Sequence, residues 1–281
     1  MEIVGKRIDD IVDNALAEDL GWGDVTTQST VPSELRGKAS MVAKASGVLA
    51  GVEIAKAVFH RLDPSLQVDI CVTDGNEVRA GDVVAELEGR VASILKAERV
   101  ALNFLQRLSG IASETRRYVE AVKGFDSRIV DTRKTTPGLR FLEKYAVRVG
   151  GGHNHRFHLG DGVLIKDNHI AVLHSQGMTL KDIVAMAKAK SPFTLKVEVE
   201  VRSVEEALEA VEAGADIVML DNMSPKEMHR AVKLVKGRAL LEASGGITLR
   251  NVRQVAETGV DFISVGALTH SVSALDVSLD M

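Results

Sequence analysis

The sequence predicts an α/β protein with a small N-terminal α/β sandwich followed by a barrel of alternating strands and helices. From residue 128, short runs rich in β-branched residues alternate with helical segments, the pattern of parallel strands joined by helices. Two such units, residues 206–220 and 251–265, are offset by 45 residues. The first hundred residues show a different pattern, in which short Val-rich runs are separated by turns.

Six short runs in the C-terminal half are expected to form parallel strands. They are residues 128–130, 163–165, 194–201, 217–220, 239–242 and 262–265. About seven strands in about 160 residues indicate a barrel smaller than the usual eightfold one. A doubly wound open sheet is also compatible with this pattern. In both repeated units a glycine, Gly214 or Gly259, ends the helix, and an acidic residue, Asp216 or Asp261, enters the strand.

The N-terminal region combines helical and strand patterns. Residues 3–18 have the apolar spacing of an amphipathic helix, and a second helix is expected over residues 52–62. Ala39, Met41 and Ala43 alternate as in a half-buried strand.

Closely spaced turns between residues 68 and 95 resemble those of biotinyl and lipoyl carrier half-barrels. A lysine at a hairpin tip is missing, so a structural sandwich is the favoured interpretation.

A long helix follows, from about Ile94, and is expected to pause at Ser109-Gly110. On this helix Arg107 is interpreted as a solvated surface charge. The expected domains are therefore residues 1–108 and the barrel of residues 109–269, with residues 270–281 returning to the first domain.

Composition excludes several classes of protein. Hydrophobic residues make up 45% and charged residues 26%, which is ordinary for a globular protein. Aromatic residues make up 4%, and 35 basic residues face 39 acidic ones, so neither a nucleic-acid surface nor a membrane partner is expected. Cys71 is the single cysteine, which excludes an intrachain disulfide. The N-terminus lacks the apolar core of a signal peptide, and a cytoplasmic location is expected.

Residues 131–169 concentrate basic charge in a chain of net charge −4. This stretch holds seven Lys or Arg against four Asp or Glu, and four of the eight histidines. Arginine suits the two-pronged hydrogen bonding of carboxylates and phosphates, and the glycines at 150–152 permit close approach of a ligand. The stretch therefore predicts a pocket for an anionic ligand.

Acidic and basic residues also occur where the expected strands end. In residues 195–201 the alternation puts Lys196, Glu198 and Glu200 on one face and four apolar residues on the other. Because helices cover the apolar face of such a sheet, the charged face is expected to point into the barrel. Charges are costly there unless they are paired or used. An exposed edge strand is the alternative.

These motifs resemble one known family. They are 132–138 (TRKTTPG), 154–156 (NHR), 165–169 (IKDNH), 196–200 (KVEVE), 220–222 (LDN) and 242–246 (EASGG), with 23–27 (GDVTT) near the N-terminus. Together, and in this order, they closely resemble quinolinate phosphoribosyltransferase, also known as nicotinate-nucleotide pyrophosphorylase (carboxylating). The likeness runs from about residue 18 to residue 276.

The resemblance implies a fold and a reaction. The fold is an N-terminal α/β sandwich and an incomplete, seven-stranded α/β barrel of the type II phosphoribosyltransferases, assembled as a homodimer or an oligomer of dimers with shared active sites. The reaction converts quinolinate and phosphoribosyl pyrophosphate, with Mg²⁺, into nicotinate mononucleotide, pyrophosphate and CO₂ in NAD biosynthesis.

The resemblance also implies roles for individual residues. Catalytic roles are expected for Lys134, Lys166, Glu200 and Asp221. Substrate binding is expected from Arg99, Thr132, Arg133, Lys134, His155, Arg156, Lys166, Glu200, Asp221, Ser244, Gly245, Gly246, Gly266 and His270. Glu200 and Asp221 are expected to serve Mg²⁺ or ribose hydroxyls, with Glu198 a weaker candidate.

Within this set, two groups of residues are expected to bind different parts of the two substrates. Arg133, Arg156 and Lys166, with Arg99 of the neighbouring subunit, are expected to bind the two carboxylates of quinolinate. Residues 244–246 and Gly266 are expected to bind the 5′-phosphate of the other substrate. Lys134 and His155 are interpreted as shared with the pyrophosphate.

Two other functions remain compatible with parts of this pattern. A related enzyme acting on another pyridine or base would keep the phosphate site and change the carboxylate clamp. A ligand-sensing module without catalysis would lose the acidic residues, and the presence of Glu200 and Asp221 argues against it.

Overall fold

The computed structural model describes residues 6–281, which form two compact units. The first unit comprises the chain up to residue 116 together with residues 135–151 and 271–281. The second unit comprises residues 117–134 and 152–270. Contacts thus group residues 135–151 with the first unit, whereas the sequence pattern assigns them to the barrel. The first three residues of the expected N-terminal helix, at positions 3–5, lie outside the described residues.

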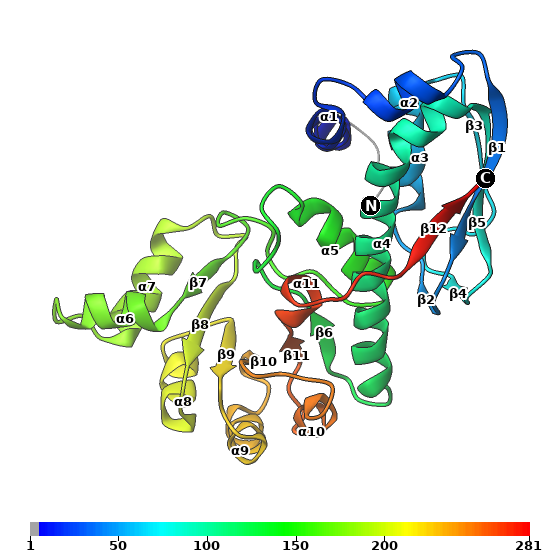
Figure 1. The fold of residues 1–281 in the computed structure, drawn as a ribbon. Helices are drawn as coiled ribbons and strands as arrows, with labels where there is room; N and C mark the ends of the chain where they lie inside the picture. The colour runs from blue at the N-terminus through cyan, green and yellow to red at the C-terminus, as the bar shows by residue number, and fades with distance from the viewer. Residues whose placement is uncertain (1–5) are drawn as a thin grey trace. The chain divides into compact units, whose positions relative to one another are not determined.

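A four-stranded antiparallel sheet forms one layer of the first unit (Figure 1). Its order is β12 (Val277–Asp280), β1 (Arg36–Ala43), β5 (Val83–Arg90) and β3 (Gln67–Ile70). Strand β1 buries Ala39, Met41 and Ala43 in alternation, as predicted. Strand β12 pairs with β1, so residues 277–280 do lie in this sheet. A second, two-stranded sheet joins β2 (Gly47–Val48) to β4 (Glu77–Val78).

Helices complete the first unit. They are α1 (Lys6–Leu20), α2 (Val25–Thr30), α3 (Val52–Leu62), α5 (Arg140–Val149) and the first part of α4 (Val91–Ala121). Helix α3 begins after Gly51, which has a left-handed φ of 94° and provides no side-chain cap. The Asp74 carboxylate takes that place and accepts the N–H groups of Gly51 and Val52, at 2.8 and 3.0 Å.

Helix α4 corrects one prediction, because it runs through Ser109 and Gly110 without a pause. Gly110 is required by packing: a Cβ there would collide with the backbone carbonyl of Ser273. The Ser109 hydroxyl accepts the backbone N–H of Ala50 at 2.9 Å. These residues therefore allow other segments of the first unit to lie close against the helix, and they do not break it.

Arg107 corrects a second prediction, because it is an ion-pair partner and not a solvated charge. Its Nε lies 2.9 Å from Oε1 of Glu143, whose side chain is fully buried. Its Nη2 donates to the Thr136 hydroxyl at 2.7 Å. The second oxygen of Glu143 accepts the backbone N–H of Thr136 at 3.1 Å. Arg107 therefore neutralises a buried acid inside the first unit.

The second unit is built on a parallel sheet. Its six strands follow the order β6 (Arg128–Val130), β11 (Phe262–Ser264), β10 (Leu240–Ser244), β9 (Ile217–Asp221), β8 (Val197–Val201) and β7 (Val163–Ile165). All six match the runs expected from the sequence. A parallel bridge between Val130 and His153 adds a single residue at the edge of β6. Within the described residues β6 and β7 are the two edges, so the barrel is incomplete.

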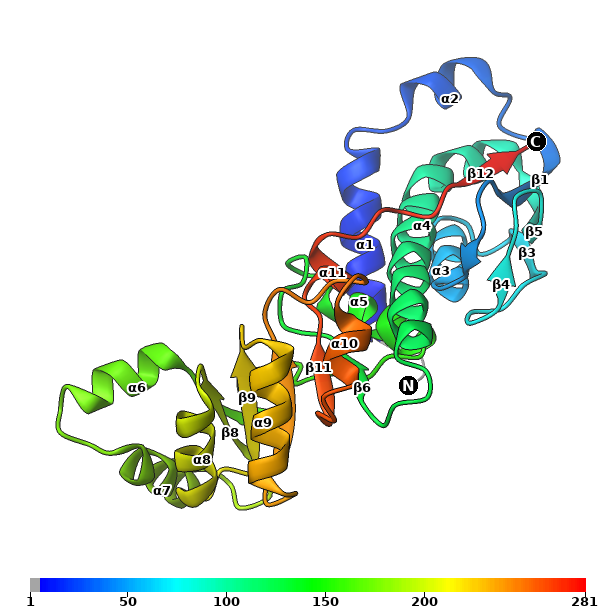
Figure 2. The same ribbon diagram turned by 90° about the horizontal axis from the view of Figure 1, so that it is seen from below.

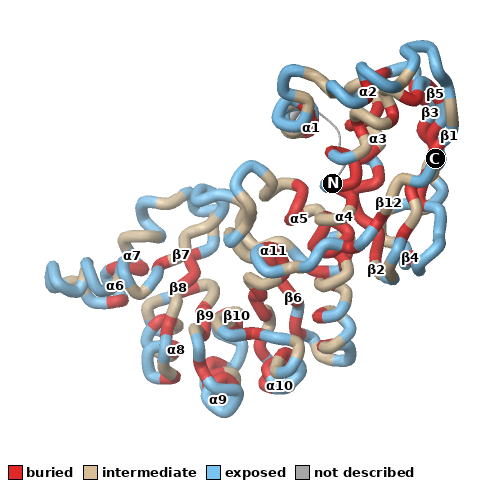
Figure 3. The backbone as a smooth tube through the Cα atoms, in the orientation of Figure 1, coloured by how far each residue is buried: buried red, intermediate tan, exposed pale blue. Residues whose placement is uncertain are grey.

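Helices cover one side of this sheet. They are α7 (Leu180–Lys190), α8 (Val204–Glu212), α9 (Pro225–Val235) and α10 (Val252–Ala256), with α6 (Asp167–His174) and α11 (Ala267–His270) after β7 and β11. Figure 2 shows α8 and α9 side by side along the strands. Val197, Val199 and Val201 are buried, as are the three middle residues of β9 and of β10, and Figure 3 shows these strands as buried and intermediate segments. The charged residues that alternate with these valines point to the other face.

The 45-residue repeat has a structural explanation. Asp216 precedes β9, and its carboxylate accepts the backbone N–H of Val197, the first residue of β8, at 2.8 Å. Asp261 precedes β11 and accepts the N–H of Leu241 in β10 at 2.7 Å. Each acid therefore holds the start of the preceding strand. None of the helices among residues 6–281 is long and apolar enough to cross a membrane.

Candidate active site

Three predicted residues come together at the carboxyl ends of β7, β8 and β9. Lys166 directly follows β7, Glu200 is the fourth residue of β8 and Asp221 ends β9. Lys166 Nζ lies 3.2 Å from Oε2 of Glu200. The side chain of Glu200 is 11% exposed and that of Asp221 is 17% exposed, so both acids are largely shielded but accessible. Ligands bind at this edge in α/β sheets.

Arg202 is a cation at the same edge that the sequence analysis missed. Its Nη2 donates to Asp167 at 2.6 Å, and its Nε lies 3.8 Å from Asp221. The signal was its place directly after the end of β8. Both acids expected to serve Mg²⁺ or ribose thus already face a protein cation.

The loop after β10 packs against the loop after β9. Gly245 and Gly246 have φ values of 86° and 61°, which favour glycine. A Cβ at Gly245 would collide with the side chain of Asn222, which itself has a φ of 56°. Asn222 donates to the Asp221 carboxylate at 2.9 Å. The glycines after Ser244 therefore let this loop reach the acid at the end of β9.

Three further predicted residues converge after β6 and β11. A Cβ on Gly266 would lie 3.2 Å from both the His270 ring and the Lys134 side chain. The Thr269 hydroxyl donates to the carbonyl of Lys134 at 2.7 Å, and Lys134 donates its N–H to the Thr132 hydroxyl at 3.0 Å. The structure thus brings Lys134, Gly266 and His270 together.

Arg133 and Arg156 lie close enough for the charge of Arg133 to act on the guanidinium group of Arg156. Burial lowers the pKa of Arg156, and the neighbouring Arg133 lowers it further, while Glu198 and Asp161 oppose both effects. Arg156 Nη1 donates to the carbonyl of Gly162 at 2.9 Å. Two neighbouring, partly buried guanidinium groups are the kind of donors that suit an anion, so the anion-binding role of this pair stays a prediction.

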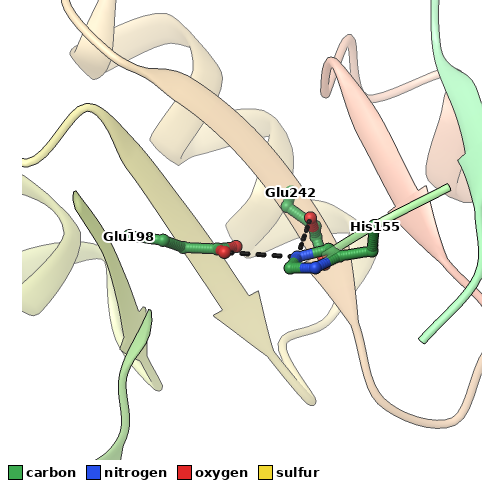
Figure 4. A group of neighbouring side chains, drawn as sticks. All are labelled: His155, Glu198 and Glu242. Carbon is green, nitrogen blue, oxygen red and sulfur yellow. Dashed lines mark ion pairs between the residues drawn. The ribbon is translucent and has the colours of Figure 1, made fainter. Parts of the chain in front are cut away.

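His155 lies between two buried glutamates (Figure 4). Its Nε2 is 3.2 Å from Oε2 of Glu198 and 3.5 Å from Oε2 of Glu242. The two glutamate side chains are 5% and 3% exposed. In the described structure Oε1 of each glutamate is buried without a hydrogen-bond partner. Glu242 was not predicted as a site residue, although an acid in the apolar strand 240–243 was a signal.

These three groups share their protons. Burial lowers the pKa of His155, but hydrogen bonds to Glu198 and Glu242 outweigh it and raise the pKa to about 10. Burial raises the pKa of Glu198, His155 lowers it, and Glu242 raises it again. The backbone N–H of Arg156 donates to Nδ1 of His155 at 2.8 Å. Because the three groups titrate together, the raised pKa belongs to the cluster, which keeps its protons on Nε2 and the glutamate oxygens. The ring itself stays neutral, since Nδ1 accepts the N–H of Arg156 and so carries no proton.

A cavity of about 460 Å³ reaches this cluster from the other end of the strands. It is lined by His155, Arg156, Glu198 and Glu242 and by apolar residues near strand starts, including Leu195, Ile217 and Phe262. Lys166, Glu200 and Asp221, which are predicted for catalysis, lie at the strand ends instead. Of the predicted site residues, His155 and Arg156 border this cavity.

Arg99 belongs to the first unit, on α4. Its side chain is 57% exposed, and it lies 3.8 Å from Glu98. Such an exposed pair contributes little to stability. A role for Arg99 toward a neighbouring subunit stays a prediction.

Comparisons with known proteins cover nearly the whole chain. Residues 24–109 match the model of the quinolinate phosphoribosyl transferase N-terminal domain, and residues 111–280 match that of its C-terminal domain. A Bacillus subtilis protein named as a probable nicotinate-nucleotide pyrophosphorylase (carboxylating) is 45% identical over 96% of this chain and 92% of its own. A mitochondrial quinolinate phosphoribosyltransferase (decarboxylating) of Nicotiana glauca is 42% identical, over 96% and 81%.

Solved structures agree with this assignment. The crystal structure of NadC from Streptococcus pyogenes is 45% identical, with a TM-score of 0.95 over 100% of this chain and 98% of that one. The human nicotinic acid phosphoribosyltransferase shares the fold alone, with 11% identity and a TM-score of 0.61 over 99% and 74%. The family models, the sequence relatives and the structures coincide, and the chain belongs to the quinolinate phosphoribosyltransferase family.

Proposed function

We infer that the protein is a decarboxylating quinolinate phosphoribosyltransferase. It converts quinolinate and phosphoribosyl pyrophosphate into nicotinate mononucleotide, pyrophosphate and CO₂, a step in the synthesis of NAD. The observation that carries this function is the pair of guanidinium groups of Arg133 and Arg156, in which the charge of Arg133 acts on Arg156, together with Lys166 in the same unit. Quinolinate has two neighbouring carboxylates, which would neutralise such a set of cations.

The reaction requires two bond changes, one after the other. The bond between ribose C1 and pyrophosphate breaks, its electron pair leaves with pyrophosphate, and the ring nitrogen lone pair forms the new bond to C1. The bond between ring C2 and its carboxylate then breaks. Its electron pair stays at C2, next to the positively charged nitrogen, CO₂ departs, and C2 takes up a proton.

The protein residues act mainly by position and charge. We assign Arg133, Arg156 and Lys166 to the carboxylates of quinolinate. Lys166 pairs with Glu200 in the free protein, so binding of quinolinate exchanges one carboxylate partner for another and releases Glu200. Asp221 and the released Glu200 then face the ribose hydroxyls.

Lys134, Gly266 and His270 form the proposed site for phosphoryl groups, together with the loop of Ser244, Gly245 and Gly246. The convergence of Lys134 and His270 over Gly266 supports this role, because a cation and exposed backbone meet there. Thr132 supports Lys134 through its hydroxyl. Negative charge on the departing pyrophosphate is stabilised by such cations.

Magnesium is proposed as the ion that accompanies phosphoribosyl pyrophosphate. Glu200 and Asp221 fit it, because carboxylate oxygens are its preferred protein ligands and both are accessible at the strand ends. Each acid faces a protein cation, Lys166 or Arg202, which suits an ion held mainly by the substrate. The bound ion would neutralise charge on the pyrophosphate.

A homodimer with shared active sites is also proposed, in which Arg99 serves the neighbouring subunit. The cytoplasmic location stays a prediction. The dimer is tested by mixing Arg99→Ala chains with Lys166→Ala chains, each inactive alone. Mixed dimers should regain one working site each. Confirmed heterodimers without recovered activity would contradict the shared site.

The function itself is tested with the purified protein, phosphoribosyl pyrophosphate and Mg²⁺. Quinolinate should give nicotinate mononucleotide and CO₂ in equal amounts. Nicotinate lacks the 2-carboxylate and leaves cations unpaired, so its turnover should be lower, by as much as about 10⁴. Efficient use of nicotinate without CO₂ release would instead indicate a related enzyme for another pyridine.

A further inference from the structure

Three buried acids are not used in the reaction described above. They are Asp131, which directly follows β6, Glu198 in β8 and Glu242 in β10, with relative exposures of 0%, 4% and 2%. A buried carboxylate is costly unless it is paired or hydrogen-bonded. Three of them inside one unit therefore require an explanation.

All three acids hold one short segment, Asn154–His155. Asp131 accepts the side-chain amide of Asn154 at 2.6 Å and the backbone N–H of His155 at 2.9 Å. Nε2 of the His155 ring lies 3.2 Å from Oε2 of Glu198 and 3.5 Å from Oε2 of Glu242. The segment has no helix or strand of its own, so its position depends on these contacts.

The ring in turn holds the next residue. Nδ1 of His155 accepts the backbone N–H of Arg156 at 2.8 Å. A nitrogen that accepts this bond has no proton, so the proton lies on Nε2, which faces the glutamates. Nε2 therefore offers no lone pair to a metal ion, although these three side chains lie close enough to surround one.

Arg156 needs such a support because Arg133 repels it. The pKa of Arg156 is lowered by burial and by Arg133, which shows that the free protein holds two like charges near one another. Without a fixed backbone, the guanidinium could move away and relieve this repulsion. A site that must bind two carboxylates at once gains from keeping both cations in place beforehand.

One acid would suffice to accept the Nε2–H of His155. With two acids present, one oxygen of each, Oε1 of Glu198 and Oε1 of Glu242, is buried without a partner, which costs stability. Replacing buried charges by apolar side chains of similar size is often neutral or stabilising. Stability alone therefore does not account for this pair.

We propose that Glu198 and Glu242 are positioning residues for quinolinate binding, which fix the His155 ring and, through its Nδ1, the backbone of Arg156. They touch neither substrate. This inference rests on the proposed function, because it takes Arg156 as a ligand of quinolinate.

The kinetic test is a double-mutant cycle of Glu198→Leu, Glu242→Leu and the double variant. Each single variant keeps one acceptor for Nε2–H and should raise the KM for quinolinate about threefold, whereas the double variant should raise it about 100-fold, within the usual range for coupled neighbours. The KM for phosphoribosyl pyrophosphate should change less than about twofold, and the melting temperature of the two single variants should not fall, because each keeps an acceptor for Nε2–H.

Asp261→Ala is the matched control, because this acid also accepts a backbone N–H in the same sheet but far from His155 in sequence. It should lower the melting temperature and leave both KM values unchanged. The proposal would be overturned if both KM values rose equally or if the effects of the two leucines were additive. It would also be overturned if the KM for quinolinate rose only as far as the melting temperature fell.

A second measurement does not depend on activity. Long-range ¹H–¹⁵N spectra report which ring nitrogen of each histidine is protonated. His155, assigned by comparison with His155→Gln, should show the proton on Nε2 in the wild type and lose this preference in the double variant. A proton on Nδ1, or a metal ion bound stoichiometrically at this histidine, would refute the proposal even if the quinolinate assay failed.

Discussion

Two buried acids of the first unit and two of the second differ in how completely they are hydrogen-bonded. In the first unit, Glu143 uses both carboxylate oxygens, one toward Arg107 and one toward the N–H of Thr136. Asp63 does the same: Ser65 donates to one oxygen, and Ser93 and Arg90 donate to the other.

In the second unit, Glu198 and Glu242 each leave one buried oxygen without a partner, and the charge of Arg133 acts on Arg156. The first arrangement satisfies every oxygen and serves stability. The second leaves two buried carboxylate oxygens unpaired beside the residues predicted to bind an anion. Burial of a charge therefore does not by itself indicate function, whereas incomplete pairing of a buried charge does.

The largest effect should come from Glu143→Ala. It removes a fully buried partner of Arg107, and breaking such a pair typically costs about 3 kcal/mol. Urea denaturation should show this loss in the free energy of unfolding, while Arg107→Met, which removes the other charge, should also be destabilising. A loss below about 1 kcal/mol would erase the contrast between the two units.

Arg156→Ala should behave in the opposite way. It removes one of two mutually repelling cations, so the melting temperature should not fall. The kcat/KM for quinolinate should fall about 10- to 150-fold, the effect of a hydrogen bond between charged groups worth about 1.5–3 kcal/mol. The KM for phosphoribosyl pyrophosphate should stay nearly constant. A destabilised variant with normal quinolinate kinetics would show that Arg156 is structural.

Asp63 gives a smaller, pH-dependent effect. Burial raises its pKa, but hydrogen bonds from Ser65, Ser93 and Arg90 outweigh this and hold the pKa well below its usual range. Its contribution to stability is thus present above the unfolded pKa of about 3.9 and is lost as the pH falls toward the folded value. Asp63→Asn should lower the melting temperature by several degrees at pH 7 and by somewhat less at pH 3, where the loss of the contribution has begun. An equal decrease at both pH values would contradict this linkage.

Gly246→Ala should have the smallest effect on stability. The residue has a φ of 61°, which costs an L-residue about 1–2 kcal/mol, but a Cβ meets nothing within 4 Å. The KM for phosphoribosyl pyrophosphate should rise severalfold and that for quinolinate should not. Gly237→Ala, also with a positive φ and open space, is the matched control and should leave both constants unchanged. Parallel changes in both KM values would remove Gly246 from the phosphate site.

The strands of the second unit could be predicted because each lies in a local pattern of β-branched residues that helices bury from one side. The charged face of residues 196–200 followed from the same alternation. The partner of Glu198 on this face could not be predicted, because only the fold brings His155 to Glu198 and Glu242.

The same limit explains Arg107 and Gly110. The partner of Arg107 lies 36 residues further along the chain, and the contact of Gly110 lies in the segment of Ser273. Local sequence predicted a solvated charge and a helix break, because a long-range partner leaves no periodic signal. Motifs predicted the substrate residues, whereas the acids that contact His155 were visible only as charges in apolar strands.

Strand β12 has a consequence for the order in which the protein is made. Strands β1 and β5 can pair as soon as residues 36–90 have left the ribosome, but the other edge of β1 receives its neighbour only with residues 277–280. Until then this edge presents free backbone groups, to which the strands of other chains can add. The unit that is synthesised first is therefore completed last, after the whole parallel sheet has been translated.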